Sequence, residues 1–469
     1  MKVQDRFLKY VSFTTTSDEN CESCPSSESQ FALGKHLAQE LEEIGLQQVK
    51  IDEHCYVYGL LPATPGHEDD DAIAFISHMD TSPDFSGVNV KPQIIENYDG
   101  GDVELIGAGR DEQGHAKMVL KVADFPTLKT LKGRTLITTD GTTLLGADDK
   151  AGIAEIVTAM EELAATDRHA ESRGYENLAG HGDIWVCFTP DEEIGRGADL
   201  VDLNYMKAKY GYTVDGGYEG DIAYENFNAC SAKFIVRGKS VHPGEAKGIM
   251  KNASLMAAEI AMALPADETP ATTEGHQGFY HLTDMQGDVT EATLCYIVRD
   301  HDQKKFEERQ EFLRQVAAKY NAKFGGTAFA NDCADKNREE NSGVSRANTE
   351  EVNRDGGSVV ELQLKHSYSN MLQVIEKCPE VLERARAAIE AVDDELSRTK
   401  PEIFGKAENC LQPVSEPVRG GTDGAKLSFM GLPCPNLGTG GYGYHGPFEH
   451  VTVEAMEAVV KIIKKIACG

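Results

Sequence analysis

Leu144-Leu-Gly-Ala-Asp148-Asp-Lys-Ala-Gly152 is the stretch from which the fold of this chain can be worked out. The apolar run Leu136-Ile-Thr-Thr139 precedes it and predicts a strand. A helical stripe of apolar side chains follows it, comprising Ile153, Ile156, Val157, Met160 and Leu163. A strand, a polar loop and a helix in this order indicate an α/β unit.

The same alternation extends over the first 226 residues. Phe31 to Ile44 carries apolar side chains at a helical period, and the runs Ala72 to Ser77 and Ile184 to Phe188 predict short buried strands. The N-terminal part of the chain therefore predicts an α/β fold, a sheet covered by helices.

The pattern changes between residues 227 and 366. This stretch predicts a compact α+β set, with strands at Ala232 to Arg237 and Thr293 to Arg299 and helices at Ala253 to Ala263 and Lys304 to Lys319. Helices are expected again at Val381 to Val392 and Val453 to Ala467. Because 469 residues exceed what one hydrophobic core usually supports, we expect residues 1–226 and 367–469 to form one domain that encloses a second, 227–366.

Composition excludes several classes of function. The chain has 77 acidic and 46 basic residues, and its formal net charge of -31 would repel a nucleic-acid backbone. The first residues, Met-Lys-Val-Gln-Asp-Arg-Phe, lack the apolar region of a secretory signal, and no stretch approaches the roughly 20 apolar residues of a membrane helix. We expect a cytoplasmic protein that binds neither nucleic acid nor membrane.

Some polar features receive no chemical role from the sequence. The eleven cysteines are scattered, and the pair Cys21-Glu-Ser-Cys24 has no second pair or nearby histidine that would complete a zinc site, so we expect an exposed loop there. The stretches 14–30, 164–182 and 331–357 are interpreted as polar insertions, and the last as an exposed or mobile loop.

Candidate metal ligands lie in separate short motifs. They are His78 in Ile-Ser-His-Met-Asp80, Asp148 in the opening stretch, Glu193 in Thr-Pro-Asp-Glu192-Glu193, Asp215 in Thr-Val-Asp-Gly-Gly and His445 in Tyr-His-Gly-Pro. Two imidazoles and three carboxylates, with a spare Glu192, are the groups that two zinc ions and one general base would need. This combination indicates hydrolysis.

Each motif taken alone has an ordinary structural explanation. Asp148 could simply cap a helix, the pair Glu192-Glu193 could be a charged loop, and His445 follows a glycine-rich turn. However, three of the motifs follow apolar strands, and ligands gather at the carboxyl ends of strands in open α/β sheets. Asp80 lies two residues after His78 and could accept the imidazole N–H that is not used for a metal.

The motifs and their order resemble the co-catalytic zinc peptidase family of aminoacylases and glutamate carboxypeptidases over nearly the whole chain. The resemblance is carried by Ile76-Ser-His-Met-Asp-Thr-Ser-Pro, Leu144-Leu-Gly-Ala-Asp-Asp-Lys-Ala-Gly, Phe188-Thr-Pro-Asp-Glu-Glu, Tyr224-Glu-Asn-Phe-Asn-Ala, Val241-His-Pro-Gly, Glu274-Gly-His-Gln-Gly-Phe-Tyr-His-Leu, Arg419-Gly-Gly-Thr-Asp-Gly-Ala and Leu432-Pro-Cys-Pro-Asn. It implies a catalytic domain with a mixed sheet covered by helices and an inserted α+β lid domain.

The resemblance also implies a role for each candidate. Asp148 would bridge two zinc ions, His78 and Asp215 would complete one site, and Glu193 and His445 would complete the other. Glu192 would be the general base, taking a proton from water and passing it to the leaving amine, and Asp80 would orient His78. A cis peptide is implied between Asp148 and Asp149.

The lid residues that match the family are assigned to the substrate. Arg299 would bind the substrate carboxylate, because its planar fork pairs with a carboxylate through two hydrogen bonds. His242 would stabilise the oxyanion, and we also assign Arg419 and Asn252 to substrate binding. A homodimer is one assembly that the resemblance allows.

The implied activity is that of an aminopeptidase that removes the N-terminal residue of tripeptides. Two alternatives remain open from the sequence: a dipeptidase or N-acyl-amino-acid deacylase on the same scaffold, and a catalytically silent protein that binds metal or peptide. The presence of Glu192 favours an enzyme, because a silent relative has no need of the base.

Overall fold

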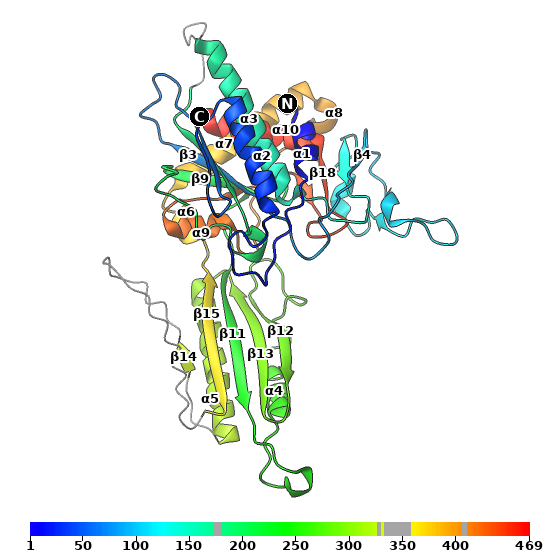
Figure 1. Ribbon diagram of the computed structural model, residues 1–469, viewed down its shortest axis with the longest axis vertical. Helices are drawn as coiled ribbons and strands as arrows, with labels where there is room; N and C mark the ends of the chain where they lie inside the picture. The colour runs from blue at the N-terminus through cyan, green and yellow to red at the C-terminus, as the bar shows by residue number, and fades with distance from the viewer. Residues whose placement is uncertain (172–179, 326–329, 333–357, 406–409) are drawn as a thin grey trace. The chain divides into compact units, whose positions relative to one another are not determined.

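The chain folds into two compact units. A computed structural model describes residues 1–171, 180–325, 330–332, 358–405 and 410–469 (Figure 1). Unit 1 comprises Met1–Tyr224, Met371–Glu416 and Thr422–Gly469, and unit 2 comprises Glu225–Asn370 and Pro417–Gly421. Within these described residues, no helix is both long and apolar enough to cross a membrane.

A mixed sheet forms the centre of unit 1. Its strands, in spatial order, are β1 (Gln47–Ile51), β2 (Val57–Leu61), β8 (Ile184–Thr189), β3 (Ile73–His78), β9 (Tyr210–Val214), β16 (Asn436–Leu437) and β10 (Ile222–Ala223). The strands β8, β3, β9 and β16 run parallel, whereas β1, β2 and β10 pair antiparallel with their neighbours. The expected α/β class and mixed sheet are confirmed.

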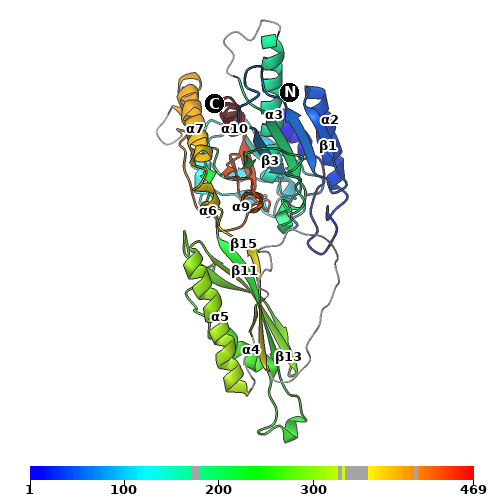
Figure 2. The ribbon, with the colours of Figure 1, turned by 90° about the vertical axis from the view of Figure 1, so that its left-hand side faces the viewer.

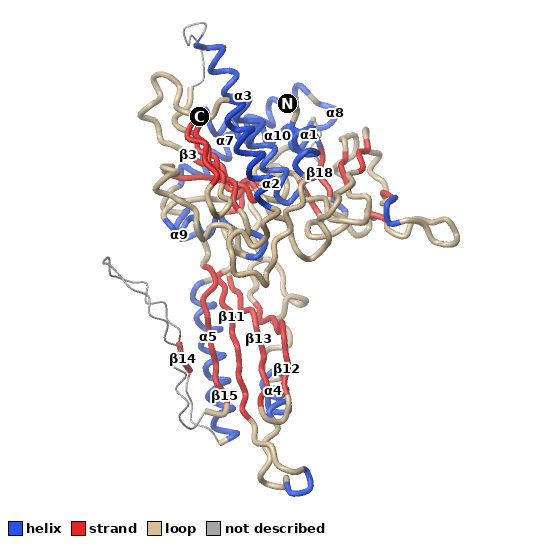
Figure 3. Tube along the Cα trace, viewed as in Figure 1, coloured by secondary structure: helices blue, strands red, loops and turns tan. Residues whose placement is uncertain are grey.

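Helices cover both faces of this sheet (Figures 1 and 3). The larger core packs one face against α1 (Val3–Tyr10), α2 (Gln30–Ile44), α3 (Ala147–Glu171), α7 (Pro379–Thr399), α8 (Pro401–Phe404) and α10 (Val453–Cys468). A smaller core packs the other face against α9 (Asp423–Met430) and residues 198–206. Alternate strand residues therefore point to opposite cores, as Phe75 and Ile76 of β3 do.

The parallel strands that end at the candidate site are tied together in the core. The rings of Phe75 on β3 and Tyr212 on β9 are fully buried and stack with centroids 5.8 Å apart. The Tyr212 hydroxyl also donates to the carbonyl of Val381 on α7, 2.8 Å away. This packing fixes the ends of β3 and β9 beside each other, where His78 and Asp215 are located.

Smaller sheets extend unit 1. One has the strand order β17 (Gly441–Tyr442), β18 (His450–Thr452), β7 (Leu136–Thr138) and β4 (Gln93–Ile95), and another pairs β5 (Val103–Glu104) with β6 (Val119–Leu120). Short helical turns η1 (Ile106–Ala108) and η2 (Pro126–Lys129) and helix α6 (Leu372–Ile375) complete the connections. Because β7 leads into α3 and β18 follows His445, this sheet joins the segments that carry Asp148 and His445.

Two of the expected polar insertions take part in the fold. The stretch 164–182 was interpreted as an insertion, but α3 continues to Glu171, and Ala164 is still buried in the main core. In the stretch 14–30, Thr15, Ser17 and Ser26 are buried and α2 begins at Gln30. Of the stretch 331–357, residues 333–357 lie outside the described residues.

Unit 2 is a layer of strands with helices on one face (Figure 2). The strand order is β12 (Phe279–Gly287), β13 (Glu291–Asp300), β11 (Asn228–Arg237), β15 (Val360–Tyr368) and β14 (Ala330–Asp332). The helices α4 (Ala253–Ala261) and α5 (Gln303–Phe324) pack on alternate buried residues of the strands, such as Phe234 and Val236 of β11. The expected strands and helices of this α+β region are all present.

The chain returns to unit 2 once more after leaving it. We expected residues 367–469 to belong entirely to the enclosing domain, but Pro417–Gly421 belongs to unit 2. Val418 forms a parallel bridge with Asn226 and donates its N–H to the carbonyl of Glu225, 2.9 Å away. A segment this short carries no periodic pattern from which such a contact could be predicted.

Candidate metal centre and catalytic site

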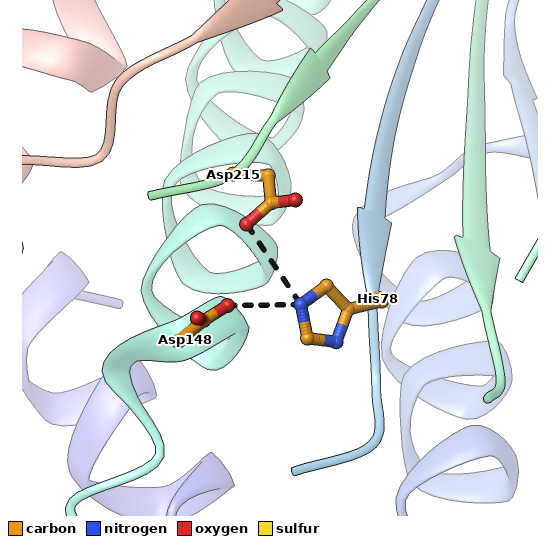
Figure 4. A group of neighbouring side chains, drawn as sticks. All are labelled: His78, Asp148 and Asp215. Carbon is orange, nitrogen blue, oxygen red and sulfur yellow. Dashed lines mark hydrogen bonds and ion pairs between the residues drawn. The ribbon is translucent and has the colours of Figure 1, made fainter. Parts of the chain in front are cut away.

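Three of the expected ligands meet at the carboxyl ends of β3 and β9 (Figure 4). His78 is the last residue of β3, Asp215 directly follows β9, and Asp148 lies at the start of α3. The Nε2 atom of His78 is 2.9 Å from Oδ1 of Asp148 and 3.8 Å from Oδ1 of Asp215. The three side chains thus point at one place from three separate elements.

A second group forms around the other oxygen of Asp148. His445 lies in the loop between β17 and β18 and adopts a positive φ of 62°. Its Nε2 is 3.5 Å from Oδ2 of Asp148 and 3.0 Å from Oε2 of Glu193. Among the described residues, these two groups of histidine and carboxylate atoms are arranged closely enough to hold a metal ion, and they share Asp148.

The segment that carries Asp148 has an irregular backbone. Asp148 and Asp149 depart from helical dihedral angles, and the peptide between them is cis, as the family resemblance implied. Asp149 is fully buried, and its Oδ2 accepts a hydrogen bond from the backbone N–H of His78 at 3.2 Å. The two aspartates therefore point to different partners, and only Asp148 faces the two histidines.

Asp80 connects His78 to the turn that carries the adjacent glutamates. The Nδ1 atom of His78 lies 3.1 Å from the Asp80 carbonyl oxygen and 3.3 Å from its Oδ1, so Nε2 is left to face Asp148. The Asp80 carboxylate also accepts from the backbone N–H groups of Glu192 and Glu193, at 3.0 and 3.2 Å. The sequence predicted the first contact but gave no signal for the second.

The electrostatics of the site follow from its crowded carboxylates. Burial raises the pKa of Asp215 well above its usual value, and the nearby charge of Asp148 raises it further. Burial likewise raises the pKa of Glu192 well above that of a free glutamate. Burial also opposes the ionisation of Asp148, but hydrogen bonds from His445 and His78 hold its pKa below the usual range. Hydrogen bonds with Asp148 and Glu193 raise the pKa of His445 to about 11.

This set of donor atoms fits a pair of divalent cations. Several carboxylates gathered out of water repel one another unless positive charge is placed among them. The buried Oε1 of Glu193 has no hydrogen-bond partner among the described residues. Imidazole nitrogen and carboxylate oxygen are both ligands that zinc accepts, and Asp148 offers one oxygen to each group.

Glu449 is a residue of this site that the sequence analysis missed. It is 1% exposed, and its carboxylate accepts backbone hydrogen bonds from Leu145 and Gly146 on Oε2, at 2.7 and 3.0 Å, and from Asp148 on Oε1 at 2.9 Å. Burial raises the pKa of Glu449 to about 7, although these N–H groups favour its ionised form. Glu449 lies four residues after His445, so one short segment both supplies a candidate ligand and supports the backbone of Asp148.

Two of the expected substrate-binding residues contact each other in unit 2. An Nη atom of Arg299, on β13, donates to the carbonyl of Arg419 at 2.8 Å. The guanidinium of Arg299 also lies over the rings of Phe279 and Tyr368. Arg419 in turn donates to the carbonyls of residues 273, 275 and 277. The structure therefore brings Arg299 and Arg419 together, on an aromatic support.

The other two candidates lie at the ends of short elements of unit 2. His242 precedes the turn η4 (Pro243–Glu245), is exposed, and accepts a hydrogen bond from the N–H of Gly244 at 3.2 Å. The side chain of Asn252 caps α4 by accepting from the N–H of Leu255 at 3.2 Å. Helix capping alone accounts for an asparagine at this position, so its assignment to substrate remains a prediction.

Comparisons with known proteins identify relatives of this chain. Residues 224–325 match the model of the peptidase dimerisation domain. The chain is 46% identical over 466 residues to Peptidase T of Caldanaerobacter subterraneus, covering 99% of this chain and 98% of the relative. It is also 46% identical over 463 residues to Peptidase T of Aliivibrio fischeri, covering 99% of this chain and 97% of that one.

Solved structures show the same fold. The chain superimposes on aminopeptidase PepT from Bacillus cereus with a TM-score of 0.65 and 19% identity, covering 100% of this chain and 97% of that one. A tripeptidase from Staphylococcus aureus gives a TM-score of 0.63 with 18% identity, covering 99% and 97%. With two full-length relatives at 46% identity, the chain belongs to the peptidase T family.

Proposed function

We propose that this protein is a zinc aminopeptidase that releases the N-terminal residue from tripeptides. The observation that carries the proposal is the pair of ligand groups that share Asp148 beside the turn of Glu192 and Glu193. Support for the substrate comes from relatives named Peptidase T and from a similar fold in a protein described as a tripeptidase. The activity is therefore inferred from the site and from the family together.

Each ligand group would hold one zinc ion. His78, Asp215 and one oxygen of Asp148 would bind the first, and Glu193, His445 and the other oxygen of Asp148 would bind the second. When bound, two such ions supply a Lewis acid for the scissile carbonyl and lower the pKa of water. Asp80 would hold the His78 ring through Nδ1, so that Nε2 faces the ligand group.

Glu192 would act as the general base. The Asp80 carboxylate holds its backbone N–H, next to the ligand Glu193. A carboxylate whose pKa is raised by burial accepts a proton more readily than a free glutamate, and can later donate it to the leaving amine. Such proton transfer contributes typically about 10²- to 10⁴-fold to the rate.

Recognition of the peptide would fall to unit 2. Arg299 carries a delocalised cation whose fork fits the C-terminal carboxylate of a short peptide. Arg419, whose carbonyl accepts from Arg299, holds the carbonyls of residues 273, 275 and 277 beside it and would bind substrate in addition. His242, exposed on its turn, would stabilise the oxyanion of the reaction, and Asn252 would bind substrate only in addition to its helix-capping role.

We further propose a homodimer formed through unit 2. Support comes from the match of residues 224–325 to the peptidase dimerisation domain. This unit also exposes the apolar side chains of Leu255, Met262 and Met285, which such an interface would cover. Light scattering on the purified protein tests this, and a monomer at micromolar concentration would contradict it.

The decisive experiment is a comparison of matched peptides with the zinc-loaded protein. We expect rapid release of the N-terminal residue from a free tripeptide, little hydrolysis of its N-acetylated form, and a higher KM for its C-amidated form. Dipeptides and tetrapeptides should react more slowly. Equal hydrolysis of the acetylated tripeptide would favour the deacylase alternative, and no hydrolysis of any peptide by metal-loaded protein would favour a silent binding protein.

A further inference from the structure

The N-terminal segment 15–30 of unit 1 forms hydrogen bonds with two loops of the proposed catalytic site. At its beginning, the backbone N–H of Ser17 donates to the carbonyl of Thr81 at 3.2 Å, and the N–H of Thr81 donates to the carbonyl of Thr15 at 3.3 Å. Thr81 directly follows Asp80, the residue that holds the N–H groups of the Glu192 turn. The segment is therefore paired with one support of that turn.

At its other end the segment contacts Asp191, the residue before Glu192. Oδ2 of Asp191 accepts from the backbone N–H of Ser26 at 2.7 Å, and Oδ1 accepts from the Ser26 hydroxyl at 2.6 Å and from Nε2 of Gln30 at 2.7 Å. Both carboxylate oxygens of this fully buried side chain thus bind the same segment. Hydrogen bonds to a buried carboxylate are short and strong, so the contact is specific.

The backbone conformation of Asp191 determines the direction in which the chain continues to Glu192. Its φ and ψ are 59° and 27°, in the left-handed region, which is sparsely populated by residues other than glycine. This backbone turn directs the chain into η3 (Glu192–Ile194), which ends at Gly195 with a positive φ of 72°. The carbonyl of Asp191 also accepts from the N–H of Arg196 at 2.9 Å. The direction of Glu192 therefore depends on holding Asp191 in this conformation.

The same segment also contacts Arg196, which follows the turn. The guanidinium of Arg196 donates to the carbonyl of Cys21 at 2.7 Å and to that of Ser23 at 3.4 Å. From the sequence alone, Cys21 and Ser23 were expected to lie in an exposed polar loop without a chemical role. The 15–30 segment instead contacts the turn at Asp191, just before the proposed base Glu192, and at Arg196, four residues after it.

We infer that Asp191, Ser26 and Gln30 are positioning residues that fix the general base Glu192. Asp191 sets the direction of the turn, and Ser26 and Gln30 act through Asp191. The inference rests on the proposed function, because it assigns the role of base to Glu192. It gives the 15–30 segment a function in turnover, separate from binding the peptide.

The test compares Ser26→Ala with Ser27→Ala in the zinc-saturated protein. Among the described residues, the Ser26 hydroxyl donates to Asp191, whereas the hydroxyl of Ser27 is hydrogen-bonded to that of Ser29, so the second variant is a matched control. We expect Ser26→Ala to lower kcat for a tripeptide by roughly ten- to a hundredfold, since small misplacement of a catalytic group has effects of this size. Its KM and metal content should stay close to those of Ser27→Ala. Its thermal midpoint should be lower, because the Ser26 hydroxyl also accepts from the backbone N–H of Asp18 at 2.9 Å and both bonds are lost.

A double-mutant cycle separates positioning from a general structural effect. Asp191→Gly removes the carboxylate and tolerates the positive φ. If Ser26 acts through Asp191, adding Ser26→Ala to Asp191→Gly should lower kcat by less than about twofold more. Independent, multiplying losses would overturn the inference, as would a kcat for Ser26→Ala equal to that of Ser27→Ala.

A measurement without substrate keeps the inference separate from the proposed function. Hydrogen exchange of the backbone amides of residues 192–196 should be faster in Ser26→Ala than in Ser27→Ala. If the wild-type protein hydrolyses no tripeptide, the proposed function fails. If hydrogen exchange of residues 192–196 is the same in Ser26→Ala as in Ser27→Ala, the 15–30 segment does not hold the turn. Faster exchange without any peptidase activity would support the positioning contact but reject Glu192 as the base.

Discussion

Replacing Glu449 by glutamine should loosen the segment that carries Asp148. The glutamate accepts three backbone hydrogen bonds, from Leu145 and Gly146 on one oxygen and from Asp148 on the other. A glutamine keeps one acceptor oxygen, and its NH₂ group faces at least one of these N–H donors. The variant therefore leaves at least one buried donor unpaired.

The size of the effect follows from the cost of that donor. An unsatisfied buried N–H costs about 1–3 kcal/mol, so the free energy of unfolding should fall by about that amount. If the glutamine places its oxygen where it keeps the bonds to Leu145 and Gly146, the unpaired donor is the N–H of Asp148. Loss of support for a metal ligand typically lowers metal affinity about 10- to 100-fold.

Two assays on metal-free protein at pH 8 measure these effects. Urea unfolding gives the loss of stability, and titration with zinc under competition from a chelator gives the loss of affinity. Glu454→Gln is the matched control, because Glu454 also accepts a backbone N–H, from Thr135 at 2.8 Å, on an element that carries no candidate ligand. It should keep the zinc affinity of the wild type. Unchanged zinc affinity in Glu449→Gln would refute the reasoning.

Three further outcomes are expected. Glu192→Gln should lower kcat about 10²- to 10⁴-fold and keep the metal content of the wild type, measured by elemental analysis. Arg299→Lys should raise KM for a free tripeptide about tenfold while leaving kcat/KM for the C-amidated tripeptide unchanged, since a lysine cannot pair with the carboxylate through a planar fork. Burial raises the pKa of Asp221 from 3.8 to about 6, so the folded state binds this proton more tightly than the unfolded state does. The contribution of the Asp221 carboxyl to the free energy of unfolding therefore falls as the pH rises from 3.8 to about 6. When the free energy of unfolding in urea is measured from pH 3.5 to 8, the fall caused by Asp221 should be absent in Asp221→Asn.

The sequence predicted most elements because their local patterns are strong. The helical stripe of Phe31 to Ile44 became α2, which begins one residue earlier and ends where Gly45 takes a positive φ of 100°. The apolar run Ala72 to Ser77 became β3, which includes His78 as its last residue. Periodicity of this kind is a property of neighbours along the chain, and so it can be recognised without the fold.

Residues that support the site from a distance escaped prediction. Glu449 and Asp191 each accept hydrogen bonds from residues far away in the sequence, and no local pattern marks an acidic residue as the partner of a remote N–H. The 15–30 segment was misinterpreted for the same reason. Its polar residues resemble a solvated loop until their partners in the Asp80 and Asp191 turns are known.

The sequence by itself determined the α/β class, the candidate ligands and their order, because these depend on residue type, spacing and resemblance to a family. Only the tertiary structure decided that Asp148 presents one oxygen to His78 and the other to His445, within 2.9 and 3.5 Å. It also decided that segments hundreds of residues apart hold the ligands and the proposed base in place. The physical reason is that a shared carboxylate and its supporting hydrogen bonds exist only once strand ends, a helix start and a distant loop have packed together.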